Sequence, residues 1–175
     1  MPAAFDSPYV ISVASSDSND GMPSYSNYGR STVDLAAPST DDNRNVGITT
    51  TSLGSKYVNS FGGTSAACPH VTGAAALLWS VKPDATPLEI KRALMQSVDQ
   101  KPVFRGKVVS NGRLNVASAL QVITNASLPP VILGALPASS RVRQDAIIEV
   151  WFSAPMDRTS VEAALQITSA VSGTV

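Results

Sequence analysis

The sequence has little of several features that would narrow its class. It contains one cysteine, Cys68, so no disulfide can form within the chain and the cysteine count does not indicate a redox compartment. Only 15% of the residues are charged, and 13 basic side chains balance 13 acidic ones. A net charge near zero, without a basic cluster, provides no field that would attract nucleic acid. We therefore expect no nucleic-acid partner.

Long apolar runs are also absent. The longest one near the middle, residues 71–81, is interrupted by Thr72, Gly73 and Ser80, whereas a membrane helix needs about 20 apolar residues. The first residues, MPAAFD, have neither a basic region nor an apolar core, so they do not form a signal peptide. We expect no membrane span.

Strand and helix patterns follow one another over residues 1–124. Apolar and β-branched residues predict strands at residues 9–14, 33–37 and 47–51. A long run of small and apolar residues, 66–78, predicts a helix. Because this helix is apolar on all sides, we expect it to be buried in the centre of its domain. Strands followed by helices indicate an α/β fold class.

Two further helices have start signals. Thr86 and Glu89 form a capping box, with Pro87 at the first helical position, and that helix extends to about Val98. Asn115 can cap a third helix over residues 116–123.

The pattern changes at residues 125–130, where two consecutive prolines indicate a linker. Beyond the linker, residues 131–175 show short strands at 131–134, 146–152 and 164–168 with turns between them. This is an all-β pattern, and it is too short for a complete sandwich.

A sharp turn leads into the long helix. Gly62 and Gly63 permit positive φ and close backbone approach. Ser65 then lies in the first helical turn, where N–H groups lack partners and the helix end carries partial positive charge. A negative oxygen developing beside Ser65 would be stabilised there, as in an oxyanion hole. An ordinary helix cap explains the same turn, because Ser and Thr are favoured at that position.

The longer segment decides between these interpretations. Residues 63–78, GTSAACPHVTGAAALL, resemble the nucleophile segment of the subtilisin-like serine proteases, the subtilases. Flanking segments follow the family in order and spacing: residues 9–17, 25–29, 33–38, 83–90 and 112–116. The resemblance covers residues 2–120. It implies the C-terminal part of a subtilisin-like parallel-sheet domain with a buried central helix.

The same resemblance implies a serine endopeptidase that acts on protein or peptide substrates outside the cell. Ser65 would be the nucleophile that forms the acyl-enzyme, and its backbone N–H an oxyanion donor, while Gly63 and Thr64 would contact substrate. No cofactor is required, and a structural Ca²⁺ ion is compatible with the family. Asp34 is a weak candidate ligand for it, together with carbonyl groups near residues 3–5.

The sequence departs from the family at several positions. Ser39 stands where the family has glycine after Ala-Ala-Pro, and Gly62 stands where a polar residue is common. Residues 47–51 resemble the convertase-related branch, whereas His70 and the helix after it resemble the bacterial branch. The subfamily and the cleavage preference therefore stay open.

The family mechanism also needs an aspartate and a histidine before the serine. None of the 64 residues before Ser65 is a histidine. His70 lies five residues after it, which on a helix is about 140° of rotation and ~7.5 Å of rise, so it points away from Ser65. We expect a buried, hydrogen-bonded histidine there. The upstream segment with Asp, His and the second oxyanion donor, Asn, is expected to be missing, and this chain alone to be inactive.

Other reactive side chains have structural interpretations. Asp17, Asp20 and Asp34 precede no histidine in the required order, and we expect structural roles for them. Cys68 follows Ser65 by three residues; it is either a second nucleophile or a small buried thiol, and we expect the thiol to be buried. Trp79 is expected in the core or an interface.

The C-terminal residues 146–157 and 159–161 resemble the opening of bacterial Ig-like modules, in which a strand ends in Phe-Ser-x-Pro-Met-Asp. Such modules follow extracellular enzymes. Two alternatives to an enzyme remain: a non-catalytic secreted or cell-surface binding protein with a relic protease fold, and a plain α/β scaffold with a capping serine.

Overall fold

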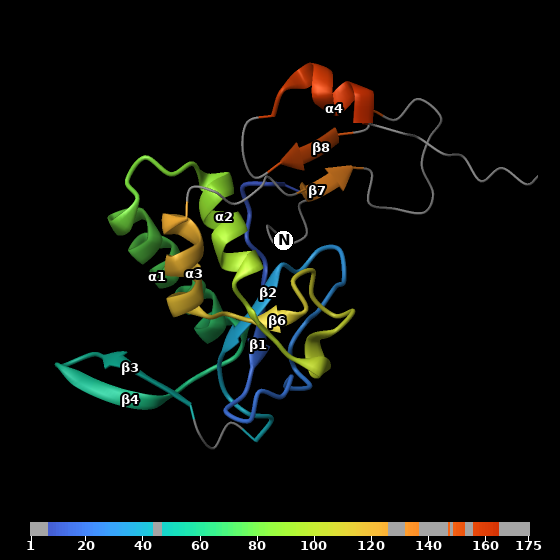
Figure 1. Cartoon of the computed structure of the whole chain (residues 1–175). Coiled ribbons are helices and arrows are strands. Elements are labelled where there is room, and N and C mark those ends of the chain that lie inside the picture. The colour runs from blue at the N-terminus through green and yellow to red at the C-terminus, as the bar shows by residue number, and fades with distance from the viewer. Residues whose placement is uncertain are drawn as a thin grey trace, which may run out of the picture.

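A mixed sheet lies at the centre of the computed structural model (Figure 1), which describes residues 7–43, 47–125, 132–136, 147, 149–152 and 156–164. Its strands are, in sheet order, β1 (Val13–Ser16), β2 (Leu35–Pro38), β6 (Gly112–Arg113) and β5 (Asp99–Gln100). The first three strands run parallel, and β5 is antiparallel to β6. The α/β fold class is confirmed, although the sheet is mixed and not purely parallel.

β1 begins later than predicted. The prediction placed a strand at residues 9–14, but the ladder with β2 starts where Val13 pairs with Leu35. Just before it, the Ser12 N–H donates to the Asp34 carboxylate and the Asp34 N–H donates to the Ser12 carbonyl. Residues 9–12 therefore lie outside the ladder that β1 forms with β2.

Three helices pack together beside this sheet (Figure 1). They are α1 (Thr64–Val81), α2 (Pro87–Gln96) and α3 (Val116–Thr124). α1 contacts β1 and β2, while α2 and α3 contact α1 and each other. None of the described helices is long and apolar enough to cross a membrane. The three-residue 3-10 helix η2 (Pro102–Phe104) lies between β5 and β6 along the chain.

The alternation of side chains along the strands divides the core in two, because successive strand residues face opposite sides of a sheet. Leu35 and Ala37 belong to the larger cluster with the buried sides of α1, α2 and α3. Ala36, between them, belongs to a smaller cluster with Phe104 and Val108.

The predicted helix starts of α2 and α3 are confirmed. The Thr86 hydroxyl accepts from the Glu89 N–H at 3.3 Å, and the Glu89 carboxylate accepts from the Thr86 N–H at 2.8 Å. Asn115 accepts from the Ser118 N–H at 2.9 Å. These caps satisfy first-turn N–H groups that have no partner within their helices.

The Glu89 charge makes α2 acid-sensitive. Its hydrogen bond from the Thr86 backbone, and then its contact with Lys82, lower the pKa of the Glu89 carboxyl. A lowered folded-state pKa stabilises the fold above the unfolded-state pKa and loses that contribution as pH falls through the folded-state value. We expect Glu89→Gln to lower the free energy of unfolding by about 0.5–1 kcal/mol at pH 7.

Urea unfolding of both proteins across pH checks this. The difference should shrink as the pH falls below the ordinary glutamate pKa of about 4.3, and it should vanish only below the lower folded-state pKa. A difference that persists unchanged at low pH would show that the charge is not the cause. Gln at this position can still complete the capping box, so the comparison isolates the charge.

The expectation that α1 is buried on all sides is wrong for the described residues. Its buried side chains form one face: Ala66, Ala67, Val71, Ala74 and Leu78. Outside this face α1 carries exposed apolar groups that point in different directions, with Leu77 43% and Trp79 38% exposed.

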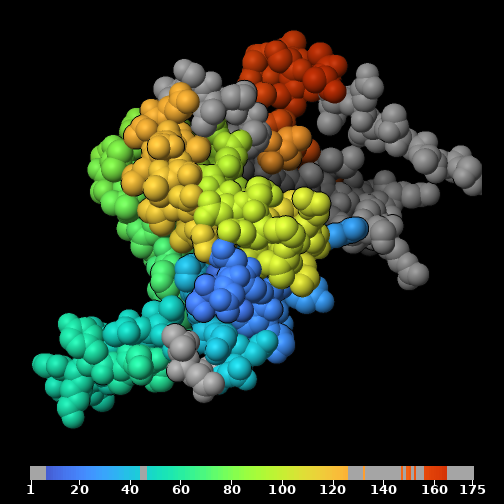
Figure 2. Space-filling view, turned by 60° about the horizontal axis from the view of Figure 1, so that its bottom comes forward, coloured from blue at the N-terminus to red at the C-terminus, as the bar shows by residue number. Residues whose placement is uncertain are grey.

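A β-hairpin that the sequence analysis predicted only in part precedes α1. β3 (Ile48–Ser52) was expected, whereas its antiparallel partner β4 (Lys56–Phe61) was not. Gly54 and Ser55 have φ of 71° and 57° in the turn. The hairpin projects from the body (Figure 2), and all of β4 is exposed. Without a buried face, β4 has no alternating apolar pattern to detect.

The C-terminal part contains an antiparallel pair, β7 (Ile132–Leu136) and β8 (Glu149–Phe152), where two strands were predicted. It also contains α4 (Arg158–Ala164), which the all-β prediction did not include and which contradicts it there. The Asp157 carboxylate accepts from the Ser160 N–H at 2.9 Å and begins this helix. The predicted linker beyond Asn125 and most of the strand predicted at 164–168 lie outside the described residues.

Candidate nucleophile site at the start of helix α1

Ser65 is the second residue of α1 and its side chain is exposed. The residue that caps this helix is Gly63, with φ 76° and ψ −179°, and no side chain donates or accepts a capping hydrogen bond there. Among amino acids, essentially only glycine adopts that backbone conformation. The capping interpretation of Ser65 is therefore contradicted, and its hydroxyl is available for another role.

The backbone around Ser65 favours negative charge. The Ala66 N–H already donates to the Gly63 carbonyl at 2.9 Å. The N–H groups of the first helical turn before it have no acceptor within the helix, and the helix dipole adds partial positive charge at this end. A hydroxyl and an anion-stabilising backbone thus lie side by side, which suits attack on a carbonyl group.

Beside Ser65 the surface is hollow. An open hollow of about 650 Å³ is lined by Thr64, Ser65 and Cys68 from α1 and by Ile11 and Val13 from the segment leading into β1. The Ser65 hydroxyl can therefore be approached from this side.

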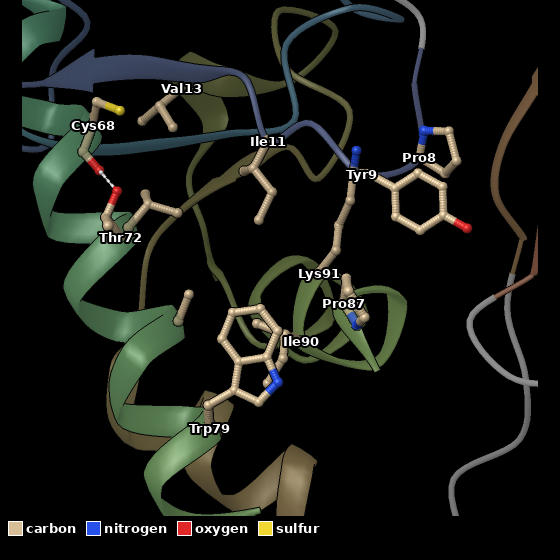
Figure 3. Close-up of a pocket in the computed structure, with 12 residues that line it drawn as sticks. Pro8, Tyr9, Ile11, Val13, Cys68, Thr72, Trp79, Pro87, Ile90 and Lys91 are labelled. Atoms are coloured by element: carbon tan, nitrogen blue, oxygen red, sulfur yellow. Dashed lines mark hydrogen bonds between the residues drawn. The ribbon is translucent and has the colours of Figure 1, made fainter. Parts of the chain in front are cut away.

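A second cavity, of about 270 Å³, continues along the exposed side of α1. Figure 3 shows it between α1 and α2, with Trp79 from α1, Ile90 from α2 and Ile11 among its lining residues. Trp79, expected in a core or interface, donates from its indole N–H to the Ala85 carbonyl at 2.8 Å. Its ring lines an uncovered apolar groove.

Gly62 and Gly63 are both required by the turn before Ser65. A Cβ at Gly62 would overlap the side chain of Thr40, which is buried. Gly63 has the positive φ described above, and its carbonyl accepts the Ser39 hydroxyl at 2.7 Å. Thr64 lines the hollow with Ser65, whereas the Gly63 carbonyl points to protein donors. Substrate contact by Gly63 and Thr64 stays a prediction.

The His70 side chain is not placed to act as a base for Ser65. Its Nδ1 lies 2.8 Å from the Ala66 carbonyl oxygen, and its side chain lines a different hollow with Ile48 and Phe61 of the β3–β4 hairpin. The predicted hydrogen-bonded helix histidine is confirmed, although its side chain is half-buried and not fully buried.

The acidic residues of the 17–21 turn are structural. Asp17 accepts from the backbone N–H groups of Asn19 and Gly21. Asp20 forms ion pairs with Lys101 at 2.6 Å and with Arg113. Both carboxylates therefore hold the turn in place.

Asp34 is also structural, and its proposed role as a cation ligand is not supported. One carboxylate oxygen lies 2.9 Å from the Lys91 ammonium, and the other accepts from the Ser12 N–H at 2.8 Å. Within the described ranges, no group of three or more His, Cys, Asp or Glu residues could hold a metal ion. The carbonyl groups of residues 3–5 lie outside those ranges.

The expectation of a buried Cys68 thiol is wrong. Cys68 is exposed, because it lies on the side of α1 that no described element covers. It lines both cavities of this side. Its exposure follows from the uncovered helix face and does not make it part of the catalytic group.

The side chains behind the glycine turn were not predicted from the sequence. Tyr25, Ser39 and Thr40 form a hydrogen-bonded group that reaches the Gly63 carbonyl. The departure of Ser39 from the family's glycine was the available signal, but its partner lies 24 residues away in the sequence.

Known proteins resemble this chain over the same region. A thermophilic serine proteinase from Bacillus sp. strain AK1 is 38% identical over 119 residues, which are 68% of this chain and 26% of that protein. An extracellular protease from Xanthomonas campestris is 34% identical over 117 residues, covering 66% of this chain and 20% of that protein. The chain thus spans about a fifth to a quarter of the length of these relatives.

The fold comparison agrees. The solved structure of subtilase cytotoxin SubAB matches with a TM-score of 0.59 and 29% identity, covering 70% of this chain and 41% of that one. The family model described as "Subtilase family" matches residues 1–121, a region that includes Ser65 and the glycine turn before it. The chain therefore belongs to the subtilase family.

Proposed function

We propose that this chain carries the nucleophile part of an extracellular serine endopeptidase, with Ser65 as the attacking residue. The observation that carries the proposal is the exposed Ser65 hydroxyl in the first turn of α1, free of any capping role and beside an open hollow. Membership of the subtilase family supports it. The substrates are proteins or peptides.

The proposed reaction proceeds in two steps. The Ser65 oxygen attacks the peptide carbonyl while its proton passes to a histidine base. The developing oxyanion accepts a hydrogen bond from the Ser65 backbone N–H. The base then gives the proton to the leaving amine, which departs and leaves an acyl-enzyme. Water, activated by the same base, releases the acid and restores Ser65.

The base and its orienting carboxylate belong to an upstream segment. No histidine precedes Ser65 in this sequence, and the relatives are several times longer than the matched region. The apolar groove lined by Trp79 and the outer edge of β1 are surfaces that such a segment would cover. We therefore propose that the 175-residue chain alone is nearly inactive.

A fluorophosphonate probe, which reacts with activated serines, tests this. The complete protein is the chain joined to its upstream segment, or to that of the Bacillus relative. The complete protein should be labelled at Ser65 as fast as an active serine protease. The 175-residue chain should be labelled orders of magnitude more slowly. Failure of the complete protein to react would favour the relic binding protein instead. Rapid labelling of the short chain would contradict the need for an upstream base.

Three further assignments are proposals of the same kind. The extracellular location draws support from the Xanthomonas relative, which is named an extracellular protease. No cofactor is required for the proposed chemistry, and a structural Ca²⁺ ion would need ligands other than Asp34, whose oxygens are engaged. The domain division places the catalytic part at residues 1–124, a linker at 125–130 and an Ig-like β module from 131, for which the β7–β8 pair is the supporting element.

A further inference from the structure

We infer that Ser39 is a positioning residue for the nucleophile, acting through the Gly63 carbonyl and held in place by Tyr25. This inference rests on the proposed function of Ser65. Ser39 is not among the residues that line the hollow beside Ser65, and its hydroxyl donates to the Gly63 carbonyl. Its effect on catalysis would pass through the backbone of the glycine turn.

The hydroxyl of Ser39 has one proton, and it donates that proton to the Gly63 carbonyl at 2.7 Å. Ser39 is 7% exposed, so water competes little for this bond. The Ser39 N–H donates to the Ser16 carbonyl at 2.7 Å, which fixes the serine to the end of β1. The turn is thereby tied to the central sheet.

Tyr25 orients the Ser39 hydroxyl. The Tyr25 hydroxyl lies 3.2 Å from the Ser39 oxygen and 2.7 Å from the Thr40 carbonyl oxygen, both of which can accept its proton. The Thr40 hydroxyl lies 2.9 Å from the same tyrosine oxygen and can donate to it. With these groups engaged, the free direction for the Ser39 proton is toward Gly63.

The Gly63 carbonyl is the part of the turn that needs support. Gly63 has no side chain and a φ of 76°, so neither packing nor ordinary backbone preference holds its peptide plane. Two donors meet at this oxygen, the Ser39 hydroxyl from β2's end and the Ala66 N–H from α1. Together they fix the plane of the peptide that joins Gly63 to Thr64.

That peptide sets the direction in which α1 begins. Rotation about Gly63 would shift Thr64 and Ser65, and with them both the hydroxyl and the N–H that would stabilise the oxyanion. Small displacements of this kind reduce turnover more than they reduce substrate binding, because transition-state geometry is the stricter requirement. A kinetic test can therefore separate positioning from general stability.

The test uses the complete protein with Ser39→Ala, Tyr25→Phe and the control Ser110→Ala. The Ser110 hydroxyl is buried and has no hydrogen-bond partner among the described residues, so its removal makes the same chemical change without affecting the turn. We expect Ser39→Ala to lower kcat about fivefold, with KM within about twofold. Tyr25→Phe should lower kcat in the same direction by less, and Ser110→Ala should leave it unchanged.

Active-site titration with the fluorophosphonate corrects each rate for unfolded protein. A wild-type protein that neither reacts nor turns over substrate would refute the proposed function itself. With an active wild type, an unchanged kcat in Ser39→Ala would overturn the positioning role. A rise in KM as large as the fall in kcat would also overturn it. So would a fall in activity that the smaller fraction of titrated active sites fully explains.

A second measurement needs no catalysis. Amide hydrogen exchange in the 175-residue chain should become about fivefold faster at Ala66 in Ser39→Ala, because its acceptor carbonyl is no longer held. Exchange at Ser118, capped by Asn115, should not change. Unchanged exchange at Ala66 would overturn the inference even if the chain proved not to be a protease.

Discussion

Replacing Ser65 with alanine, in a protein that also contains the upstream catalytic segment, is expected to lower turnover of a peptide substrate by about 10⁶-fold. That magnitude is the one found for removal of the nucleophile in subtilisin, which belongs to the same family. The physical reason is that no acyl-enzyme can form without the Ser65 oxygen. The backbone donors at the start of α1 remain and leave a residual acceleration over water of about 10³–10⁴-fold.

Steady-state kinetics with a peptide substrate measures this loss. The control is Ser80→Ala, the same change at an exposed serine near the far end of α1, where the hydroxyl donates to the Leu77 carbonyl. It should keep kcat/KM within about twofold, since exposed substitutions of this kind have small effects. Retention of even one hundredth of the activity in Ser65→Ala would exclude Ser65 as nucleophile.

Replacing Lys91 with methionine is expected to lower the free energy of unfolding by about 3–5 kcal/mol. The Lys91 ammonium lies 2.9 Å from the Asp34 carboxylate, and their side chains are only 7% and 11% exposed. It also donates to the Val10 carbonyl at 2.7 Å. Methionine fills a similar volume but leaves the Asp34 charge buried without its counter-ion. Because whole domains are stable by only about 5–15 kcal/mol, this variant is close to unfolding.

Urea unfolding at pH 7 measures this effect, and the chain offers a matched control. Lys82 pairs with Glu89 at 3.1 Å, but the two side chains are 30% and 25% exposed. Lys82→Met should therefore cost about 1 kcal/mol or less. The double variant Lys91→Met with Asp34→Asn should recover much of the loss, because no unpaired charge remains buried. Equal costs for Lys82→Met and Lys91→Met would show that burial of the Asp34 pair is not what matters.

Local features were predicted well from the sequence because their partners are close along the chain. The capping box joins Thr86 to Glu89, and the Asn115 cap reaches Ser118. His70 bonds to a carbonyl four residues before it. Each contact follows from helix geometry, in which residues three and four apart are neighbours.

Elements without a buried face were predicted poorly. β4 is exposed along its whole length, and α4 has no buried residue. Hydrophobic periodicity is the main signal for helices and strands, and it exists only where one side of an element is covered. The exposure of Cys68 was missed for a related reason. A helix that is apolar on all sides predicts that other elements pack around it, but the described residues pack against α1 on one side only.

The sequence by itself determined the helix caps, the glycine turn and the family segment that contains Ser65, because each depends only on residues close together along the chain. The tertiary structure alone decided that Lys91 neutralises Asp34, that Ser39 reaches Gly63, and that Ser65 caps nothing. The first two are contacts between positions 57 and 24 residues apart, as the sequence numbers show. A chain can bring such positions together in many ways, and only the packing of β1 and β2 against α1 and α2 selects one of them.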